Sequence, residues 1–61
     1  MTFEIQVPQQ NASEVALCLN GLNLDFSYYE GRGMYMEFFI HDIDINGFDI
    51  IEQGLIKNGL I

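Results

Sequence analysis

The stretch LDFSYYEGRGMYMEFFIH, residues 24–41, decides the fold because it holds two alternating runs on either side of a glycine-rich turn. In both runs every second residue is apolar, which is the pattern of a β-strand with one buried face. The tripeptide Gly31-Arg32-Gly33 separates the runs and is typical of a hairpin turn, because glycine adopts the backbone conformations that tight turns require. The sequence therefore predicts a β-hairpin.

The length of the turn determines which residues of the hairpin face each other. A two-residue loop would place Phe26 opposite Glu37, an apolar residue against an acid. A three-residue loop, Gly31 to Gly33, pairs Phe26 with Phe38 and gathers the apolar side chains on one face. We therefore expect the three-residue loop. In this register Tyr29 lies opposite Tyr35.

An earlier alternating run, FEIQV at residues 3–7, predicts another strand with one apolar face. Pro8 ends it, because proline has no backbone N–H to donate to a neighbouring strand. The chain thus contains three predicted strands.

The segment between the first strand and the hairpin predicts a helix. Asn11 can cap its start, and Glu14 three residues later completes a capping box. Gly21 marks its end. The expected core stripe has the i, i+3, i+4, i+7 spacing of a helix and comprises Val15, Cys18, Leu19 and Leu22. Cys18 is accordingly expected to pack as a small hydrophobic residue.

A second helix is predicted after the hairpin. Asn46 is its expected cap, Asp49 lies in the first turn, and Lys57 lies near the end, where a cation suits the helix dipole. Gly54 falls in the interior, where glycine costs about 1 kcal/mol relative to alanine. The expected core stripe is Phe48, Ile51 and Leu55.

The predicted order is β-α-β-β-α, in a single α+β domain spanning residues 1–61. A right-handed crossover through the first helix places both helices on one face of a three-stranded sheet. The strand order is then 1-3-2, with the third strand in the centre. This arrangement is a split βαβ, or ferredoxin-like, fold that lacks its last strand.

The other face of such a sheet has no cover within this chain. It carries Tyr29, Tyr35 and Phe39 beside carboxylates, whereas a solvated sheet face is usually polar throughout. Exposed aromatic clusters with polar rims mark interaction surfaces, so we expect a homodimer or a partner protein here. Alternatively, Tyr29 and Tyr35 form a cross-strand pair that only stabilises the sheet.

The charge balance excludes several classes of partner. The 61 residues include nine acids and two bases, for a net charge of −7. Arg32 and Lys57 are too few to neutralise phosphates, which argues against nucleic acids and anionic membranes as direct partners. An acidic surface suits a basic protein, although acidity also keeps a small apolar domain in solution. One cysteine and no export signal lead us to expect a cytoplasmic protein.

Candidate catalytic and metal sites are weak. Residues 42–47, DIDING, match the first half of a calcium loop, but the twelfth position is Gln53 and not the required acid. Only weak calcium binding stays open, and no metal or cofactor is expected. His41 is expected to face outward and Cys18 inward, so they form no nucleophilic pair, and we expect no enzyme.

These observations lead to a functional hypothesis. The protein would be a small non-enzymatic, homodimeric inhibitor that imitates the charge of a nucleic acid and binds a basic, nucleic-acid-handling protein such as a defence nuclease. The alternative is a small regulatory module that binds a metabolite at a homodimer interface. The residues expected to contact the partner are Glu30, Glu37, Asp42, Asp44, Tyr29, Tyr35 and Phe39.

Overall fold

The framework of the protein, in a computed structural model covering residues 1–61, is a three-stranded antiparallel sheet with strand order β1-β3-β2. Two helices and a short 3₁₀ turn complete the chain. The elements are β1 (Phe3–Pro8), η1 (Gln9–Asn11), α1 (Ala12–Gly21), β2 (Asp25–Glu30), β3 (Tyr35–His41) and α2 (Ile45–Lys57). The predicted order β-α-β-β-α and the central position of the third strand are confirmed.

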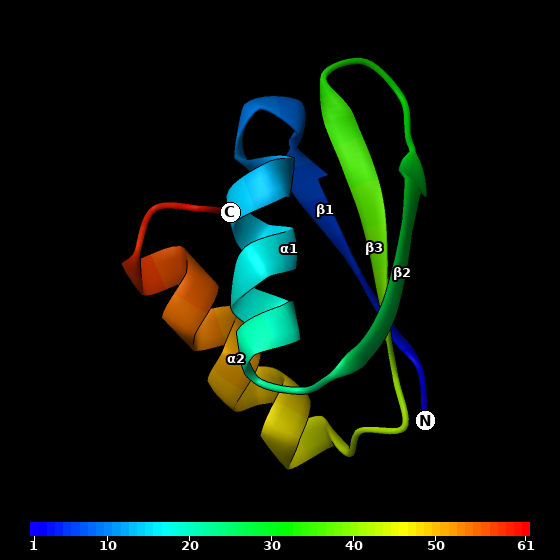
Figure 1. Ribbon diagram of the computed structural model, residues 1–61, viewed down its shortest axis with the longest axis vertical. Coiled ribbons are helices and arrows are strands. Elements are labelled where there is room, and N and C mark those ends of the chain that lie inside the picture. The colour runs from blue at the N-terminus through cyan, green and yellow to red at the C-terminus, as the bar shows by residue number, and fades with distance from the viewer.

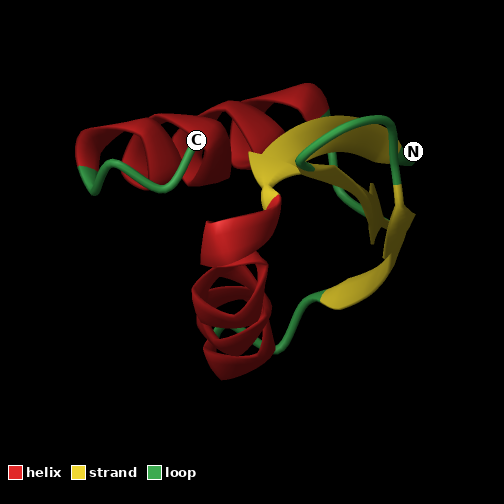
Figure 2. Cartoon of the chain, turned by 90° about the horizontal axis from the view of Figure 1, so that it is seen from above, coloured by secondary structure: helices red, strands yellow, loops and turns green.

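Both helices lie on the same side of the sheet (Figures 1 and 2). The view in Figure 2 shows the helices to one side of a strongly curved sheet, whose other side faces no other element. The predicted α+β architecture is therefore confirmed. Neither helix reaches the length and apolar character that a membrane span requires.

The hairpin register differs from the predicted one by two residues. Phe26 lies opposite Ile40, and Tyr28 lies opposite Phe38. β3 begins later than the alternating pattern suggests, so Met34 lies in the turn with 71% of its surface exposed. The longer turn allows the rings of Tyr28 and Phe38 to stack with centroids 4.9 Å apart. Because the shift is an even number of residues, every strand side chain keeps its predicted face.

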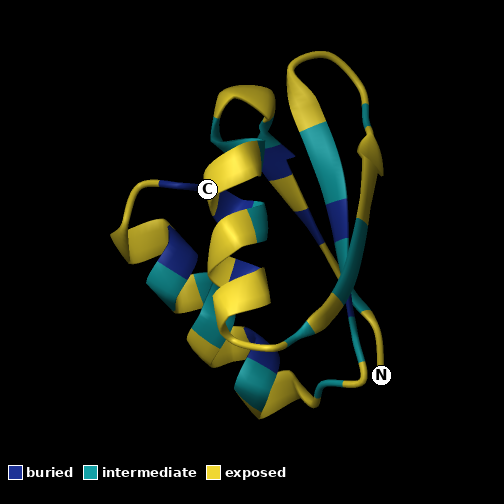
Figure 3. Cartoon of the chain, in the orientation of Figure 1, coloured by how far each residue is buried: buried dark blue, intermediate teal, exposed yellow.

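Nine residues make up the buried core, which lies between the sheet and the helices (Figure 3). Phe38 and Ile40 of the central strand are fully buried, since helices cover one side of β3 and strands flank it. Phe3 adds a stacked contact with Phe48 of α2, with ring centroids 4.6 Å apart. The buried residues are Ile5, Val7, Val15, Leu19, Phe38, Ile40, Phe48, Leu55 and Leu60.

The buried face of α1 is rotated from the predicted stripe. Val15 and Leu19 are buried as predicted, but Cys18 is exposed and Leu22 is 60% exposed. The face that α1 packs against the core comprises Ala12, Val15, Ala16 and Leu19. This stripe has the same spacing as the predicted one but begins three residues earlier. The prediction for Cys18 and Leu22 was wrong because alanine is a weak hydrophobic signal, although its small side chain suits a close helix–sheet contact.

The predicted caps of both helices also differ. Asn11 makes no capping hydrogen bond; its Nδ2 atom donates to the carbonyl oxygen of Leu60 at 3.1 Å and ties the C-terminal segment to the start of α1. α2 begins before Asn46, and its cap is Asp44, whose carboxylate accepts a hydrogen bond from the backbone N–H of Gly47 at 2.7 Å. The core stripe of α2 is as predicted, with Phe48 and Leu55 buried.

Candidate functional site

The side of the sheet opposite the helices is the first candidate site, and we call it the outer face. It is formed by every second residue of the three strands, because successive strand residues point to opposite sides. Its central strand carries Glu37, Phe39 and His41, flanked by residues of β1 and β2. The outer face comprises Glu4, Gln6, Asp25, Ser27, Tyr29, Tyr35, Glu37, Phe39 and His41, as the alternation predicts.

An aromatic pair occupies the middle of the outer face. The ring of Tyr29 meets that of Phe39 edge-on, with centroids 5.9 Å apart and an angle of 64° between the planes. Tyr29 is 60% exposed and Phe39 is half-buried. Glu37 lies opposite Tyr29 on the neighbouring strand, and Glu4 lies opposite Phe39. Two carboxylates therefore flank the two rings on an open surface.

His41 forms side-chain hydrogen bonds at one end of the outer face. Its Nε2 atom lies 3.0 Å from Ser27 Oγ, and its Nδ1 atom lies 3.2 Å from Thr2 Oγ1. In a neutral imidazole one nitrogen donates and the other accepts, and a hydroxyl can satisfy either role. The imidazole thus links the residue before β1 to β2 across the central strand.

Sequence reasoning missed this His41 network because of the register. With Phe26 opposite Phe38, His41 would lie beyond the start of the preceding strand, whereas in the structure it lies opposite Asp25. The sequence did contain one signal for this contact, because the alternation of strand residues placed Ser27 and His41 on the same face of the sheet. No cavity adjoins the imidazole, and Thr2 stands where a catalytic triad has a carboxylate.

The structure brings together three of the seven residues predicted to contact a partner: Tyr29, Glu37 and Phe39. Tyr35 shares the outer face but lies at its other end, opposite Pro8. Tyr29 lies opposite Glu37 and not Tyr35, so the expected Tyr29–Tyr35 cross-strand pair was wrong.

The remaining three predicted contacts lie elsewhere. Glu30 lies opposite Met36 on the helical side of the sheet. Asp42 and Asp44 belong to the link between β3 and α2. Asp42 adopts a left-handed backbone conformation with φ of 54°, and Asp44 caps α2. Asp44 therefore has a structural task, which the sequence reasoning did not assign to it.

The charges of the protein all lie at or near the surface. No acidic or basic side chain is buried, and the nine carboxylates outnumber the two cations, Arg32 and Lys57. Arg32 lies in the hairpin turn and Lys57 at the end of α2, so neither belongs to the outer face. No three His, Cys, Asp or Glu side chains gather as metal ligands, and in residues 42–47 the carboxylate of Asp44 is engaged by the cap.

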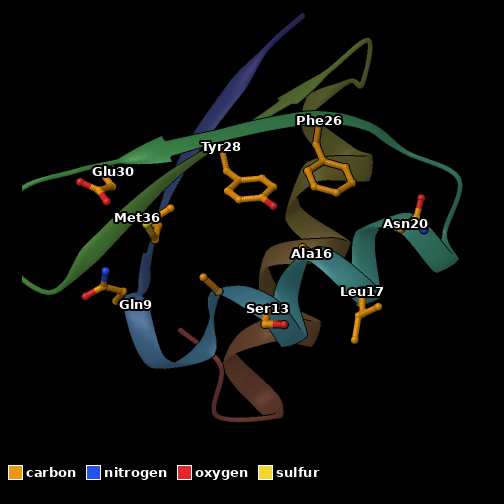
Figure 4. A pocket seen from close by; sticks show the side chains of 10 residues that line it. Gln9, Ser13, Ala16, Leu17, Asn20, Phe26, Tyr28, Glu30 and Met36 are labelled. Carbon is orange, nitrogen blue, oxygen red and sulfur yellow. The ribbon is translucent and has the colours of Figure 1, made fainter.

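A groove between α1 and β2 is a second candidate site (Figure 4). Phe26 and Tyr28 point from β2 toward the helix and form one wall of this groove. Its volume is about 570 Å³, and Glu30 is its only charged residue. The lining residues are Gln9, Ala12, Ser13, Ala16, Leu17, Asn20, Phe26, Tyr28, Glu30 and Met36.

Comparison with known proteins finds no match for this chain. No protein-family model matches the chain, and no curated protein or solved structure matches it.

Proposed function

We propose that this protein is a small non-enzymatic inhibitor whose outer face binds a basic, nucleic-acid-handling protein in the cytoplasm. The observation that supports the proposal is the exposed ring of Tyr29 against the half-buried ring of Phe39, with the carboxylates of Glu37 and Glu4 beside them on a face that no helix covers. The unpaired thiol of Cys18 suits a reducing compartment.

The aromatic pair supplies the anchor of such a contact. Tyrosine is enriched among the residues that contribute most to protein–protein binding, since a rigid ring buries a large area at a small cost in side-chain entropy. Tyr29 is exposed and already held edge-on by Phe39, so little side-chain freedom is left to lose when a partner covers it. Aromatic surface that is left in contact with water is unfavourable, and on a sheet face it marks a site that another molecule can cover.

The carboxylates determine which class of protein the outer face attracts. Side chains directly opposite each other on neighbouring strands lie about 5 Å apart, so Glu4 and Glu37 come within reach of the two rings. Proteins that hold single-stranded nucleic acids contact phosphates with Lys and Arg and stack bases on aromatic side chains. A surface of carboxylates and rings offers both kinds of contact to the same basic groove and so competes with the nucleic acid.

A competition assay tests the proposal. Proteins retained by the immobilised chain at low salt are purified, and the binding of each to a fluorescent oligonucleotide is followed by anisotropy as the free chain is added. We expect the chain to displace the oligonucleotide. The variant Glu37→Gln should compete less well than the matched control Glu14→Gln, which removes the same charge from α1. Equal loss in both variants would show that net charge, and not the outer face, governs binding and would refute the proposal.

A second candidate function rests on the groove between α1 and β2. Its volume lies within the range of about 300–1,000 Å³ that small-molecule sites occupy. Neutral hydrogen-bonding groups from Gln9, Ser13 and Asn20 surround an aromatic wall, which suits a neutral or cationic metabolite with a flat apolar part. Calorimetric titration against a metabolite panel, with Tyr28→Ala as the control variant, separates this function from the first. Binding that survives Tyr28→Ala would place the metabolite elsewhere.

A further inference from the structure

A narrow groove lies between the two helices and has a predominantly aliphatic lining, and we call it the inter-helix groove. It has a volume of about 170 Å³, and no acidic or basic residue lines it, although the chain carries nine acids. The lining residues are Cys18, Leu19, Leu22, Ile50, Ile51, Gly54, Leu55 and Asn58.

Gly54 is the unusual residue of this groove. It lies inside α2, where glycine is disfavoured relative to alanine. Nothing lies within 4 Å of the place where a Cβ atom at this position would sit, and its backbone conformation does not require glycine. The fold of one chain therefore offers no reason for a glycine here. The missing side chain leaves a hollow in the helix surface that something outside the chain could fill.

Ile50 is a projecting side chain on the same face of α2 as that hollow. It lines the same groove one helical turn before Gly54, and 74% of its surface is exposed. Residues four apart in a helix share a face. Leu22 of α1 adds a second exposed aliphatic side chain to the groove. One face of the molecule thus carries both a projecting side chain and a hollow of matching apolar character.

We propose that the inter-helix groove binds a second copy of the chain, with the two α2 helices antiparallel about a two-fold axis near Glu52. In that arrangement Ile50 of each copy lies over Gly54 of the other, because an antiparallel pair centred on residue 52 brings position 50 opposite position 54. A two-fold interface must be complementary to itself. The Ile50–Gly54 spacing meets this requirement within a single helix.

The distribution of charge also favours a second copy at this surface. Two chains of net charge −7 repel each other, so association is opposed least at a surface that is not lined by carboxylates. The outer face carries Glu4, Asp25 and Glu37, whereas the inter-helix groove carries no charge. A standard interface of about 800 Å² per partner would cover about a fifth of the chain's surface of 4226 Å² and leave the outer face free.

The variant Gly54→Ala tests the proposal, because its two expected effects have opposite signs. Alanine should raise the melting temperature of the dilute monomer by about 4–8 °C, since it favours the helix and meets no neighbouring atom. The same methyl group fills the hollow, so the dimer dissociation constant from sedimentation equilibrium should rise about tenfold or more. A raised melting temperature with unchanged dimerisation would overturn the proposal, as would a wild-type chain that stays monomeric at millimolar concentration.

A matched pair of isoleucine variants supplies the second test. Ile50→Ser should raise the dissociation constant about tenfold or more, whereas Ile56→Ser, an exposed position on the same helix outside the groove, should leave it unchanged. Equal effects of the two substitutions would contradict the proposed contact.

Cys18 reports where any dimer forms, because it is the only cysteine, is exposed and forms part of the α1 wall of the groove. We expect its maleimide labelling rate to fall as protein concentration rises through the dimer dissociation constant. Unchanged labelling in a sample that sediments as a dimer would place the contact on another surface, such as the outer face, and overturn the inference.

Discussion

The rings of Tyr29 and Phe39 meet edge-on with centroids 5.9 Å apart, on the side of the sheet that faces neither helix. Tyr29 comes from the edge strand β2 and Phe39 from the central strand β3, so the pair spans two strands. Its position allows binding and stability to be measured separately, because removing an exposed ring leaves the core unaltered.

Tyr29→Ala should weaken binding of the proposed basic partner by about 2 kcal/mol or more, or roughly thirtyfold, if Tyr29 is an anchor of the contact. The free energy of unfolding should fall by less than about 1 kcal/mol, the size of a cross-strand pair. Anisotropy and urea denaturation measure the two quantities. Met34→Ala, an exposed residue of the turn outside the outer face, is the control. A loss of stability as large as the loss of binding would argue against an anchor role.

His41→Ala should lower the free energy of unfolding by about 1 kcal/mol, since it removes hydrogen bonds to Ser27 and Thr2. The bond to Ser27 is partly buried and the bond to Thr2 is exposed, so the first should contribute more. Double-mutant cycles with Ser27→Ala and Thr2→Ala, followed by urea denaturation, measure each share. A larger coupling energy with Thr2 would be inconsistent with this geometry.

Asp44→Ala should destabilise the protein by about 0.5–2 kcal/mol, because it removes the cap of α2. Asn46→Ala should change the unfolding free energy by less than about 0.5 kcal/mol, since Asn46 is an exposed residue inside the helix. Thermal unfolding of the two variants compares the structural cap with the one that the sequence suggested. The opposite ranking of the two variants would mean that α2 begins later than Ile45.

Association with the proposed partner should slow as salt is added. The screening length falls from about 10 Å at 0.1 M to about 3 Å at 1 M ionic strength, which weakens long-range attraction between the acidic face and a basic groove. Stopped-flow measurements should show a falling association rate with a much smaller change in dissociation rate. In the Glu37→Gln variant the salt dependence should be shallower than in Glu14→Gln. An association rate that does not respond to salt would contradict an electrostatic choice of partner.

The order of elements and the side of each strand residue could be predicted because they depend on the periodicity of apolar residues. Ile5 and Val7 fall on the buried side for this reason, as do Phe38 and Ile40 of the central strand. The sheet topology could be predicted because crossover connections are right-handed. The register could not be predicted, because the alternating pattern is the same after a shift of two residues. The observed register stacks Tyr28 on Phe38, a contact between side chains that periodicity does not describe.

The candidate site was predictable to the same extent. Alternation placed Tyr29, Glu37 and Phe39 on one uncovered face, and the structure brings them together. Glu30 and Asp44 were predicted as contacts only because of their charge. In the structure Glu30 lies on the opposite side of the sheet, and Asp44 caps α2. Charge alone does not show which carboxylates share a surface, because that depends on where each element ends.

The placement of both helices on one side of the sheet has a consequence for valency. If two copies join through their helices, their outer faces point away from each other, and the assembly is bivalent. A target with two basic sites at a suitable separation would then be bound with avidity, because the second contact forms at the high effective concentration created by the first. A target with one such site would gain nothing, so the same interface would make the protein selective for oligomeric or repeated targets.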